Sequence, residues 1–250
     1  MKLIVDTGFA GARAAGPVLQ NAETGSILAI TVAPSCHNHE EEILAVCETL
    51  KDTGAPIYAG AQRPTLRDDT PANTAPGTCG APAPAPGHAV NAIIDAANAN
   101  PGLTVLCLGP VTNLALALMK EPDLAQKIGK IIIAGGAQLG YSGVNEVAEY
   151  NIFCDPEAAL TVFTCGAPVT MVPKEAADDY LAAATALCLG KADAAQQYDA
   201  FIDVDVSPSK TYGQTVVDPI GYNPITFEKH AGEKATVIAE CTLKKEGTHA

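Results

Sequence analysis

The sequence predicts an α/β fold: a doubly wound, mostly parallel sheet flanked by helices, with a small antiparallel addition at the C-terminal end. Three observations support this prediction. Apolar runs of strand length alternate with segments of helix length, as in successive βαβ units. Most of these runs are continuously apolar, which indicates strands buried on both faces. Beyond residue 200, two runs instead alternate apolar and polar side chains, which is typical of half-exposed antiparallel strands.

The first six predicted strands are continuous apolar runs, and five helical segments separate them. The strands read LIVD, SILAITV, PIYAG, TVLCLG, KIIIAGG and PVTMVP. The helices are predicted near residues 12–22, 39–53, 88–99, 112–128 and 155–166. The last of these helices has the clearest boundaries, because Asp155 is a good N-cap, Pro156 suits the first helical position and Gly166 suits the end.

The rest of the chain does not follow this alternation of strands and helices. Residues 70–88 hold many prolines and glycines and predict an extended, partly polyproline-like surface loop. Residues 174–200 are rich in alanine and predict a shortened helical segment. Within 201–250, FIDVDV and ATVIAECTL predict strands that pair antiparallel at a sheet edge. With no internal repeat and no marked shift in composition, residues 1–250 are expected to form a single domain.

Composition excludes several classes of protein. The net charge is −13 and no basic stripe is present, which argues against a nucleic-acid partner. No run of about 18 apolar residues predicts a membrane span, and the N-terminal apolar run is too short for a signal peptide. The eight cysteines are scattered without a C-x-x-C pair. Most are therefore expected to be small buried side chains, and the expected compartment is a reducing cytoplasm.

The candidate site lies outside the carboxyl ends of the parallel strands, where open α/β sheets bind ligands. Four turns can line it: residues 6–13, 33–39, 109–113 and 137–151. The last of these turns ends in the sequence AEYN, where a carboxylate and an amide suited to binding hydroxyl groups precede a helix.

These segments together resemble the inosine-uridine nucleoside hydrolase family. The resemblance is strongest over LGPVTNLALAL, IIIAGG and AEYNIFCDPEAA, and it continues through YAGAQRP and GQTVVD. It implies a nucleoside hydrolase-like fold, a ribonucleoside or ribose-like ligand and assembly into homo-oligomers. The family cleaves the N-glycosidic bond of ribonucleosides with a bound calcium ion, and calcium needs six to eight oxygen ligands.

The first turn departs from the family's pattern. The family carries the aspartate-rich sequence Asp-Thr-Asp-Pro-Gly-Ile-Asp-Asp-Ala, which supplies metal ligands and the base that activates water. This chain keeps Asp6 and Thr7 but has Gly8, Ala12 and Arg13 in place of three aspartates. We therefore expect neither a calcium ion nor another cofactor.

At the other functional positions of the family, this chain matches some residues and lacks others. Thr112 matches a residue whose backbone carbonyl binds calcium, and Glu149 and Asn151 match the pair that binds ribose. A Gly-Asn turn after the second strand is replaced by PSCHN, where Asn38 is a shifted substitute for ligand binding. The family's His-Gly-x-Asp-Gly loop corresponds to PGTCG, without its polar groups. The late His-Asp pair falls in a deleted segment, where Asp193 is a weak metal candidate.

Several residues have two interpretations. Asp6 either bonds backbone amides of the next turn or pairs with Arg13, whose charge would then replace calcium. His37, Asn38 and His39 either form a metal site or begin a helix. Glu149 and Asn151 either satisfy backbone groups or line a pocket.

Two further residues also carry alternatives. Cys154 is either a reactive thiol near a helix N-terminus or a packed core residue. Asp218, in GQTVVD, is either the late metal carboxylate or, by its match to the family's C-terminal strands, a residue beyond the site.

Three functions follow from these residues. The first is a nucleoside hydrolase-like protein that is impaired in hydrolysis and retained for ligand binding, regulation or scaffolding. The second is an active N-glycoside hydrolase with a rebuilt, metal-independent site in which Glu149 is the base and Arg13 an electrostatic stabiliser. The third is a structural, oligomeric subunit whose pocket is closed.

Overall fold

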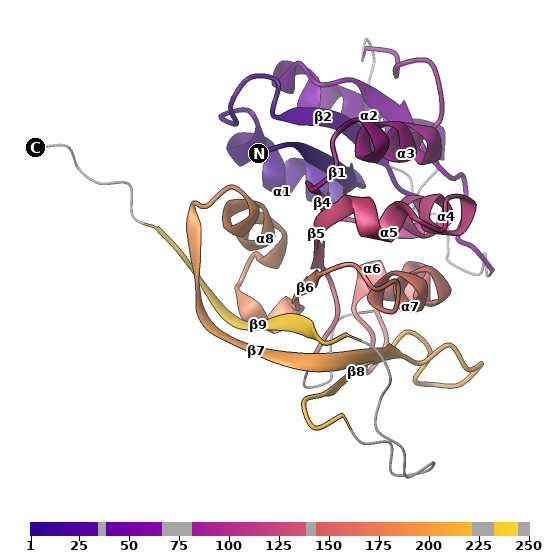
Figure 1. The fold of residues 1–250 in the computed structure, drawn as a ribbon, viewed down its shortest axis with the longest axis vertical. Helices are drawn as coiled ribbons and strands as arrows, with labels where there is room; N and C mark the ends of the chain where they lie inside the picture. The colour runs from indigo at the N-terminus through magenta and orange to yellow at the C-terminus, as the bar shows by residue number, and fades with distance from the viewer. Residues whose placement is uncertain (35–38, 67–81, 139–143, 222–232, 245–250) are drawn as a thin grey trace, which may run out of the picture.

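The structure, a computed structural model, describes residues 1–34, 39–66, 82–138, 144–221 and 233–244. In these residues one nine-stranded sheet has the order β3-β2-β1-β4-β5-β6-β9-β7-β8 (Figure 1). The strands are β1 Leu3–Thr7, β2 Ile27–Val32, β3 Ile57–Ala59, β4 Leu103–Cys107, β5 Ile128–Ala134, β6 Val169–Val172, β7 Ala192–Val204, β8 Thr215–Asp218 and β9 Ala235–Leu243. The helices are α1 Phe9–Leu19, α2 His39–Leu50, α3 Ala89–Ala99, α4 Thr112–Lys120, α5 Leu124–Lys127, α6 Tyr150–Cys154, α7 Pro156–Phe163 and α8 Tyr180–Cys188, with short 3-10 helices at Lys51–Thr53 and Lys174–Ala176.

The first six strands are parallel, which confirms the predicted doubly wound sheet. β1 lies at the centre of this part, paired with β2 on one side and β4 on the other. Every residue of β1 and β4 is buried, as their continuously apolar sequences predict.

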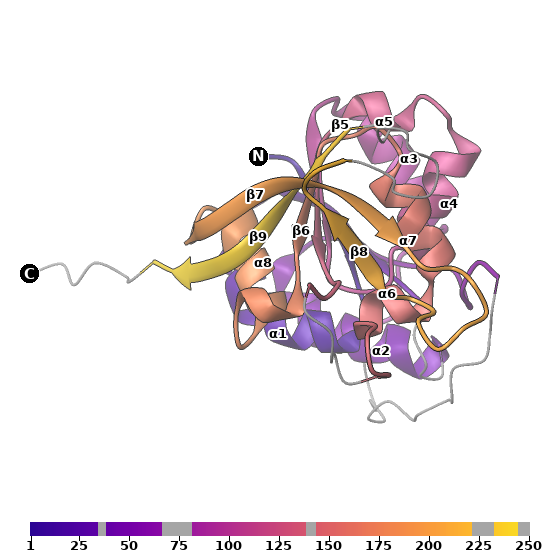
Figure 2. The same ribbon diagram turned by 90° about the horizontal axis from the view of Figure 1, so that it is seen from below.

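Helices cover both faces of the sheet and give two hydrophobic cores (Figures 1 and 2). Helices α1, α2 and α8 pack on one face, where Leu19, Val46 and Ala184 belong to one cluster of buried residues. Helices α3, α4, α5 and α7 pack on the other face, where Ile93, Leu114 and Val162 belong to the second cluster. Helices on both faces explain why the strands lack polar alternation.

The C-terminal strands differ in part from the prediction. β7 and β9 pair antiparallel, as expected, but β9 lies inside the sheet, between β6 and β7, and runs parallel to β6. Residues 201–204 pair with β8 instead. The predicted helical segment 174–200 was wrong beyond α8, because residues 192–200 form the first part of β7. Pairing with β9 here outweighs the helix propensity of an alanine-rich sequence.

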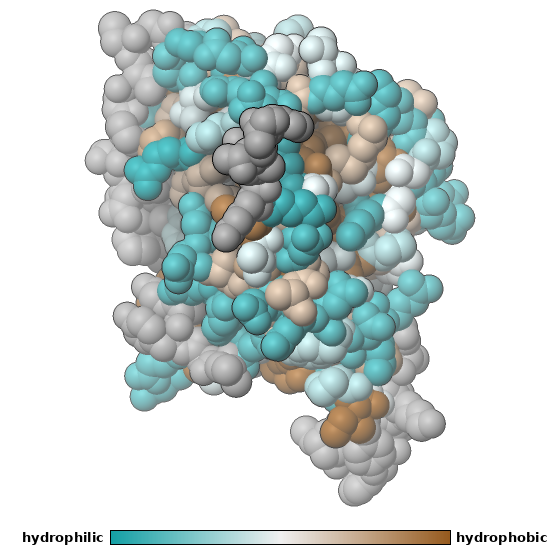
Figure 3. All heavy atoms as spheres, turned by 90° about the vertical axis from the view of Figure 1, so that its left-hand side faces the viewer, coloured by the Kyte–Doolittle hydropathy of each residue, from teal (hydrophilic) through white to brown (hydrophobic). Residues whose placement is uncertain are grey.

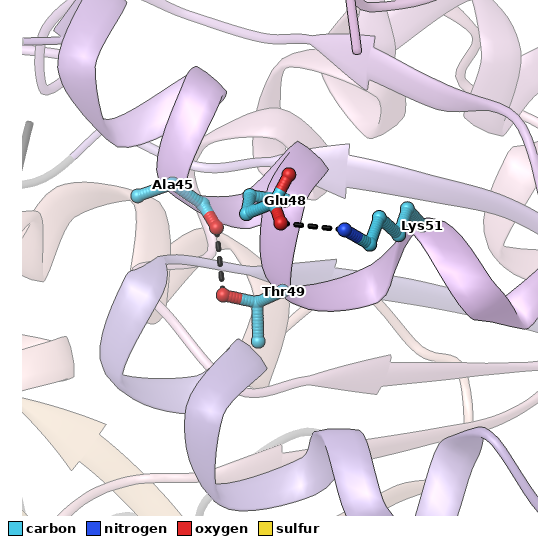
Figure 4. A network of polar contacts seen from close by, with 4 residues as sticks. All are labelled: Ala45, Glu48, Thr49 and Lys51. Carbon is cyan, nitrogen blue, oxygen red and sulfur yellow. Dashed lines mark hydrogen bonds and ion pairs between the residues drawn. The ribbon is translucent and has the colours of Figure 1, made fainter. Parts of the chain in front are cut away.

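The end of α2 is held by local contacts (Figure 4). Thr49 Oγ1 donates to the carbonyl of Ala45 at 2.7 Å, and Lys51 Nζ donates to Glu48 Oε1 at 2.6 Å on the exposed side. Gly54, with φ of 70°, follows the 3-10 turn that continues the helix. α2 lies beside α1, with Leu50 next to Gly16 and Glu42 bonded to the backbone nitrogen of Phe9, so the first turns of the two helices meet.

The surface of the described residues is largely hydrophilic. On the face shown in Figure 3, hydrophilic residues surround smaller apolar areas. Large exposed apolar side chains, such as Leu66, Met119 and Ile220, come from different segments. Among the described helices, none has the length and apolar character needed to cross a membrane.

Candidate ligand-binding site

The strand order reverses between β1 and β4. From β1 the chain forms β2 and β3 on one side, and it then returns to form β4 on the other. In open parallel sheets, ligands bind outside the carboxyl ends of the strands at such a point. The two turns that leave β1 and β4 approach closely here, since a Cβ on Gly109 would lie 2.8 Å from the backbone nitrogen of Gly8. The backbones of these two turns therefore leave no room for a side chain at position 109.

Asp6 lies in β1 at this point and is fully buried. Its Oδ1 accepts hydrogen bonds from Thr31 Oγ1 at 2.7 Å and Asn113 Nδ2 at 2.9 Å. Its Oδ2 has no hydrogen-bond partner among the described residues. Burial raises the pKa of Asp6 to about 7, although the two hydrogen bonds act in the opposite direction. Asp6 thus binds side chains of β2 and α4, and the expected bonds to backbone amides of the next turn were wrong.

Asn113 joins three elements at the edge of the sheet. Besides Asp6, its Nδ2 donates to the carbonyl of Val32 at 3.0 Å, and its Oδ1 accepts from the backbone nitrogen of Ala61 at 2.9 Å. Asn113 is fully buried. The sequence placed the turn 109–113 at the site but gave this side chain no role. The sequence feature that could have indicated this role is the single amide side chain within the apolar run LGPVTNLALAL.

Glu42 contributes a buried carboxylate that the sequence did not lead us to expect at this site. The acidic run of residues 40–42 does form the first turn of α2, yet Glu42 is only 1% exposed. Its Oε1 accepts a hydrogen bond from the backbone nitrogen of Phe9, at the start of α1, at 2.6 Å. Its Oε2 has no partner among the described residues. The available signal was its position, since Glu42 lies four and eight residues before the buried Val46 and Leu50.

Thr112 and Asp155 form a second polar centre beside the first. Asp155 is the predicted N-cap of α7, and its side chain accepts from the backbone nitrogen of Ala158, which confirms that prediction. Its Oδ2 also accepts from Thr112 Oγ1 at 2.6 Å and from both the backbone nitrogen and Oγ1 of Thr65 at 2.8 Å. The Thr112 side chain is thereby committed to joining α4 with α7.

Glu149 is the N-cap of α6, lies beside the turn that follows β5 and is 1% exposed. Its carboxylate caps α6 by accepting from the backbone nitrogens of Asn151 at 3.0 Å and Ile152 at 3.3 Å. It also accepts from the backbone nitrogen of Gly136 at 3.0 Å and from Tyr180 Oη at 2.6 Å. Burial raises the pKa of Glu149, and these hydrogen bonds oppose that rise. Asn151 donates to the carbonyl of Ala134 at 2.8 Å.

Tyr180 is the third residue, after Asn113 and Glu42, to which the sequence gave no role at this site. It is the first residue of α8 and comes from the face of the sheet that α1 covers. Its hydroxyl donates to the carboxylate that the family resemblance assigns to ribose. Burial, followed by the charge of Glu149, raises the pKa of Tyr180, so the phenol stays protonated and acts as a donor. Oε1 of Glu149 thus already accepts a hydrogen bond from a hydroxyl group of the protein.

Other predicted site residues lie elsewhere. Arg13 is exposed on α1, and the hydrogen bonds of Asp6 come from Thr31 and Asn113, so the predicted Asp6–Arg13 pair was wrong. Asp193 is exposed at the outer end of the ribbon formed by β7 and β9, where it pairs with Lys244 at 3.2 Å. Asp218 accepts from the backbone nitrogens of Ile220 and Gly221 in the turn after β8.

The remaining predictions concern residues 37–39 and Cys154. α2 begins at His39, which agrees with a helix start, whereas His37 and Asn38 lie outside the described residues. Most of the predicted loop 70–88 also lies outside them. The Cys154 side chain is buried at the end of α6, which agrees with packing.

The described residues do not fit a calcium ion. Calcium needs several carboxylate and carbonyl oxygens converging on one point. No group of three or more His, Cys, Asp and Glu side chains in the described part of the chain is arranged to hold a metal. Asp193 and Asp218 lie away from Asp6, and the oxygens of Glu149 already accept four hydrogen bonds. Gly8 and Ala12 bring no carboxylate from the first turn.

Comparisons with known proteins agree with this architecture. A sequence profile described as inosine-uridine preferring nucleoside hydrolase matches residues 4–180. The chain is 38% identical over 139 residues to the pyrimidine-specific ribonucleoside hydrolase RihB of Escherichia coli, covering 52% of this chain and 44% of that protein. It is 30% identical over 231 residues to a putative RihB of Shigella dysenteriae, covering 71% of this chain and 84% of that protein. The E. coli match thus spans less than half of its relative.

A solved structure has the same fold. The purine-preferring ribonucleoside hydrolase from Gardnerella vaginalis superposes with a TM-score of 0.74 at 22% sequence identity, covering 96% of this chain and 93% of that chain. The similarity includes the antiparallel C-terminal strands as well as the parallel part of the sheet.

Proposed function

Because the chain belongs to the inosine-uridine preferring nucleoside hydrolase family, we propose that it binds a ribonucleoside or a ribose-like ligand and is impaired in hydrolysing the N-glycosidic bond. The proposed ligand site is the carboxyl edge of β1, β4 and β5. The printed names of the relatives, which are ribonucleoside hydrolases, support the class of ligand. A role in binding, regulation or scaffolding follows from the proposed loss of hydrolysis.

One observation carries the proposed impairment. Asp6 is the only carboxylate from β1 to the end of α1, and its Oδ1 is bound by Thr31 and Asn113. Gly8, Ala12 and the exposed Arg13 follow it. Without a set of converging carboxylates, this turn does not provide the hard oxygen ligands that calcium requires.

Hydrolysis also requires a group that takes a proton from water. Glu149 is a poor candidate because its two oxygens accept four hydrogen bonds, one of them from the Tyr180 hydroxyl. Arg13 is too exposed to stabilise charge developing beside Asp6. These observations favour the first of the three functions over a rebuilt, metal-independent hydrolase.

The test combines ligand binding with activity on the purified chain. Binding of D-ribose, inosine and uridine is measured by titration calorimetry. In a thermal scan each compound is also expected to raise the melting temperature of the chain, because a ligand of the native state stabilises that state. Calcium is expected to produce no such rise. Release of ribose from inosine or uridine that disappears on adding EDTA would overturn the proposed impairment. Absence of binding by all three compounds would overturn the proposed ligand.

A structural subunit with a closed pocket is the second candidate, and the bond from Tyr180 to Glu149 favours it. The Tyr180→Phe variant separates the two functions. If ribose must displace this hydroxyl, the variant should bind ribose about tenfold more tightly, since a hydrogen bond to a charged group contributes about 1.5–3 kcal/mol. Calorimetry on both proteins measures the change.

Tyr198→Phe is the matched control, because Tyr198 donates to Gln138 at 2.6 Å, away from Glu149. If the wild-type chain binds no ribose and the Tyr180→Phe variant also binds none, the closed pocket is supported. Light scattering would then establish whether the chain forms a homo-oligomer.

A further inference from the structure

Glu42 occupies the space beside Gly8 where a side chain of the first turn would lie. A Cβ built on Gly8 would be 2.7 Å from Glu42 Oε1, closer than a carbon and an oxygen can approach. The backbone of Gly8 is extended, with φ of −102° and ψ of −174°, a conformation open to any residue. A side chain at position 8 would therefore have to displace the end of the Glu42 side chain, although the backbone of Gly8 itself accepts any residue.

The carboxylate of Glu42 lies at the N-terminus of α1. Gly8 is the N-cap of α1 and offers no side chain to the first turn of that helix. Glu42 supplies the missing acceptor from α2 through its bond to Phe9. The helix N-terminus carries partial positive charge, which stabilises an anion at this position.

One oxygen of this carboxylate is left over. Glu42 Oε2 is buried without a hydrogen-bond partner among the described residues, and so is Asp6 Oδ2. Asp6 lies in β1 two residues before Gly8, and Glu42 approaches Gly8 from α2, so the two carboxylates flank the turn that follows β1. Buried polar atoms are nearly always hydrogen-bonded in native proteins, and exceptions require an explanation.

We propose that Glu42 is the acidic ligand-binding residue of this site and that its Oε2 accepts a hydrogen bond from a hydroxyl group of the ligand. The inference rests on the proposed function and adds a residue on α2 to it. A carboxylate oxygen only accepts, so its complement is a donor. A hydroxyl-bearing ligand fits better than a metal ion, because the described residues provide no third ligating side chain.

The first arm of the test measures whether Glu42 and a side chain at position 8 exclude one another. Gly8→Asp in the wild-type background is expected to lower the melting temperature, because the new carboxylate meets Glu42. In the Glu42→Ala background the same substitution is expected to raise it, because aspartate is a preferred N-cap and the space is open. The same direction of change in both backgrounds would overturn the placement of Glu42 in this space.

The second arm separates ligand binding from helix capping. Glu42→Gln keeps an oxygen that accepts from Phe9 but removes the charge and one acceptor. We expect its affinity for D-ribose and inosine to fall at least about tenfold, which corresponds to about 1.4 kcal/mol. Glu48→Gln, an exposed site on the same helix, is the control and is expected to bind like the wild type.

The two proposals fail in different ways. If the wild type binds ribose or inosine and Glu42→Gln binds equally well, the role of Glu42 is overturned and the proposed function stands. If the wild type binds neither compound, the proposed function is overturned together with the ligand role of Glu42. In that case, if Gly8→Asp lowers the melting temperature of the wild type but raises that of Glu42→Ala, Glu42 acts only as a helix cap.

Discussion

The buried carboxylates of Asp6, Glu42 and Glu149 have different partners, and these partners determine what each can do. Glu149 accepts four hydrogen bonds and holds the start of α6. Asp6 uses one oxygen to join β2 and α4. Glu42 uses one oxygen to cap α1. All three carboxylates thus hold elements together, but only Asp6 and Glu42 keep one oxygen without a hydrogen-bond partner among the described residues.

Asp6 should make stability depend on pH. Its pKa in the folded chain is raised to about 7 by burial, whereas an exposed aspartate has a pKa near 3.8. The folded state therefore binds a proton more tightly than the unfolded state. Its contribution to stability is fully present below about pH 4, falls as the pH rises to about 7, and amounts to at most about 4 kcal/mol.

Asp6→Asn tests this contribution. The variant keeps an oxygen for Thr31 and Asn113 but does not titrate, so its stability should fall less than that of the wild type between about pH 4.5 and 7.5. Urea unfolding at several pH values measures both proteins, and the difference between the two curves isolates Asp6 from Glu149, whose pKa is also raised. Parallel curves would contradict the prediction.

At the scale of secondary structure, polar side chains position the helices around the site. Asp155 caps α7 and binds Thr112 of α4 and Thr65 after β3. Asn113 ties α4 to the ends of β1 and β2. Asp155 and Asn113 each join segments that are far apart in sequence. The arrangement of the residues at this edge of the sheet therefore depends on contacts that no local sequence pattern reveals.

Asp155→Ala should therefore destabilise the chain more than loss of a helix cap alone. A lost N-cap costs about 1 kcal/mol, and the buried hydroxyl of Thr112 left without its acceptor costs a further 1–3 kcal/mol, so we expect about 2–4 kcal/mol. Urea unfolding measures the free energy of unfolding. Asp179→Ala is the matched control, because Asp179 caps α8 by accepting from Ala182 but is exposed.

The control should lose only about 1 kcal/mol. Equal losses in the two variants would mean that Asp155 acts as a cap and that its bonds to Thr65 and Thr112 add nothing to stability.

The sequence predicted the parallel strands well because their signal is local. A continuously apolar run flanked by turns has few interpretations, and all six runs became strands at nearly the expected residues. Residues 192–200 were misread because their alanines favour helix locally, while their pairing with β9 depends on residues about forty positions later. Glu42 and Tyr180 were missed for the same reason, since each reaches the site from a helix whose docking the sequence does not specify.

For the whole molecule, the position of β9 has a consequence for stability. β9 comes last among the described strands yet lies between β6 and β7, so it connects the parallel part of the sheet to the C-terminal strands. Its Val237 and Ile238 are almost fully buried, one in each of the two cores. β9 therefore covers the edge of β6 and contributes to both cores.

A chain that ends at Lys234 should not unfold cooperatively, whereas a chain that ends at Lys244 should. The shorter chain lacks β9, which leaves the edges of β6 and β7 unpaired and exposes apolar residues of both cores, so we expect aggregation through the open edges. The longer chain keeps β9 complete and should melt within about 2–4 °C of the full chain, a difference equivalent to about 1 kcal/mol. Scanning calorimetry and light scattering on both truncations measure the outcome. Cooperative unfolding of the chain that ends at Lys234 would mean that β1 to β6 fold independently, and the C-terminal strands would then be an accessory to the site.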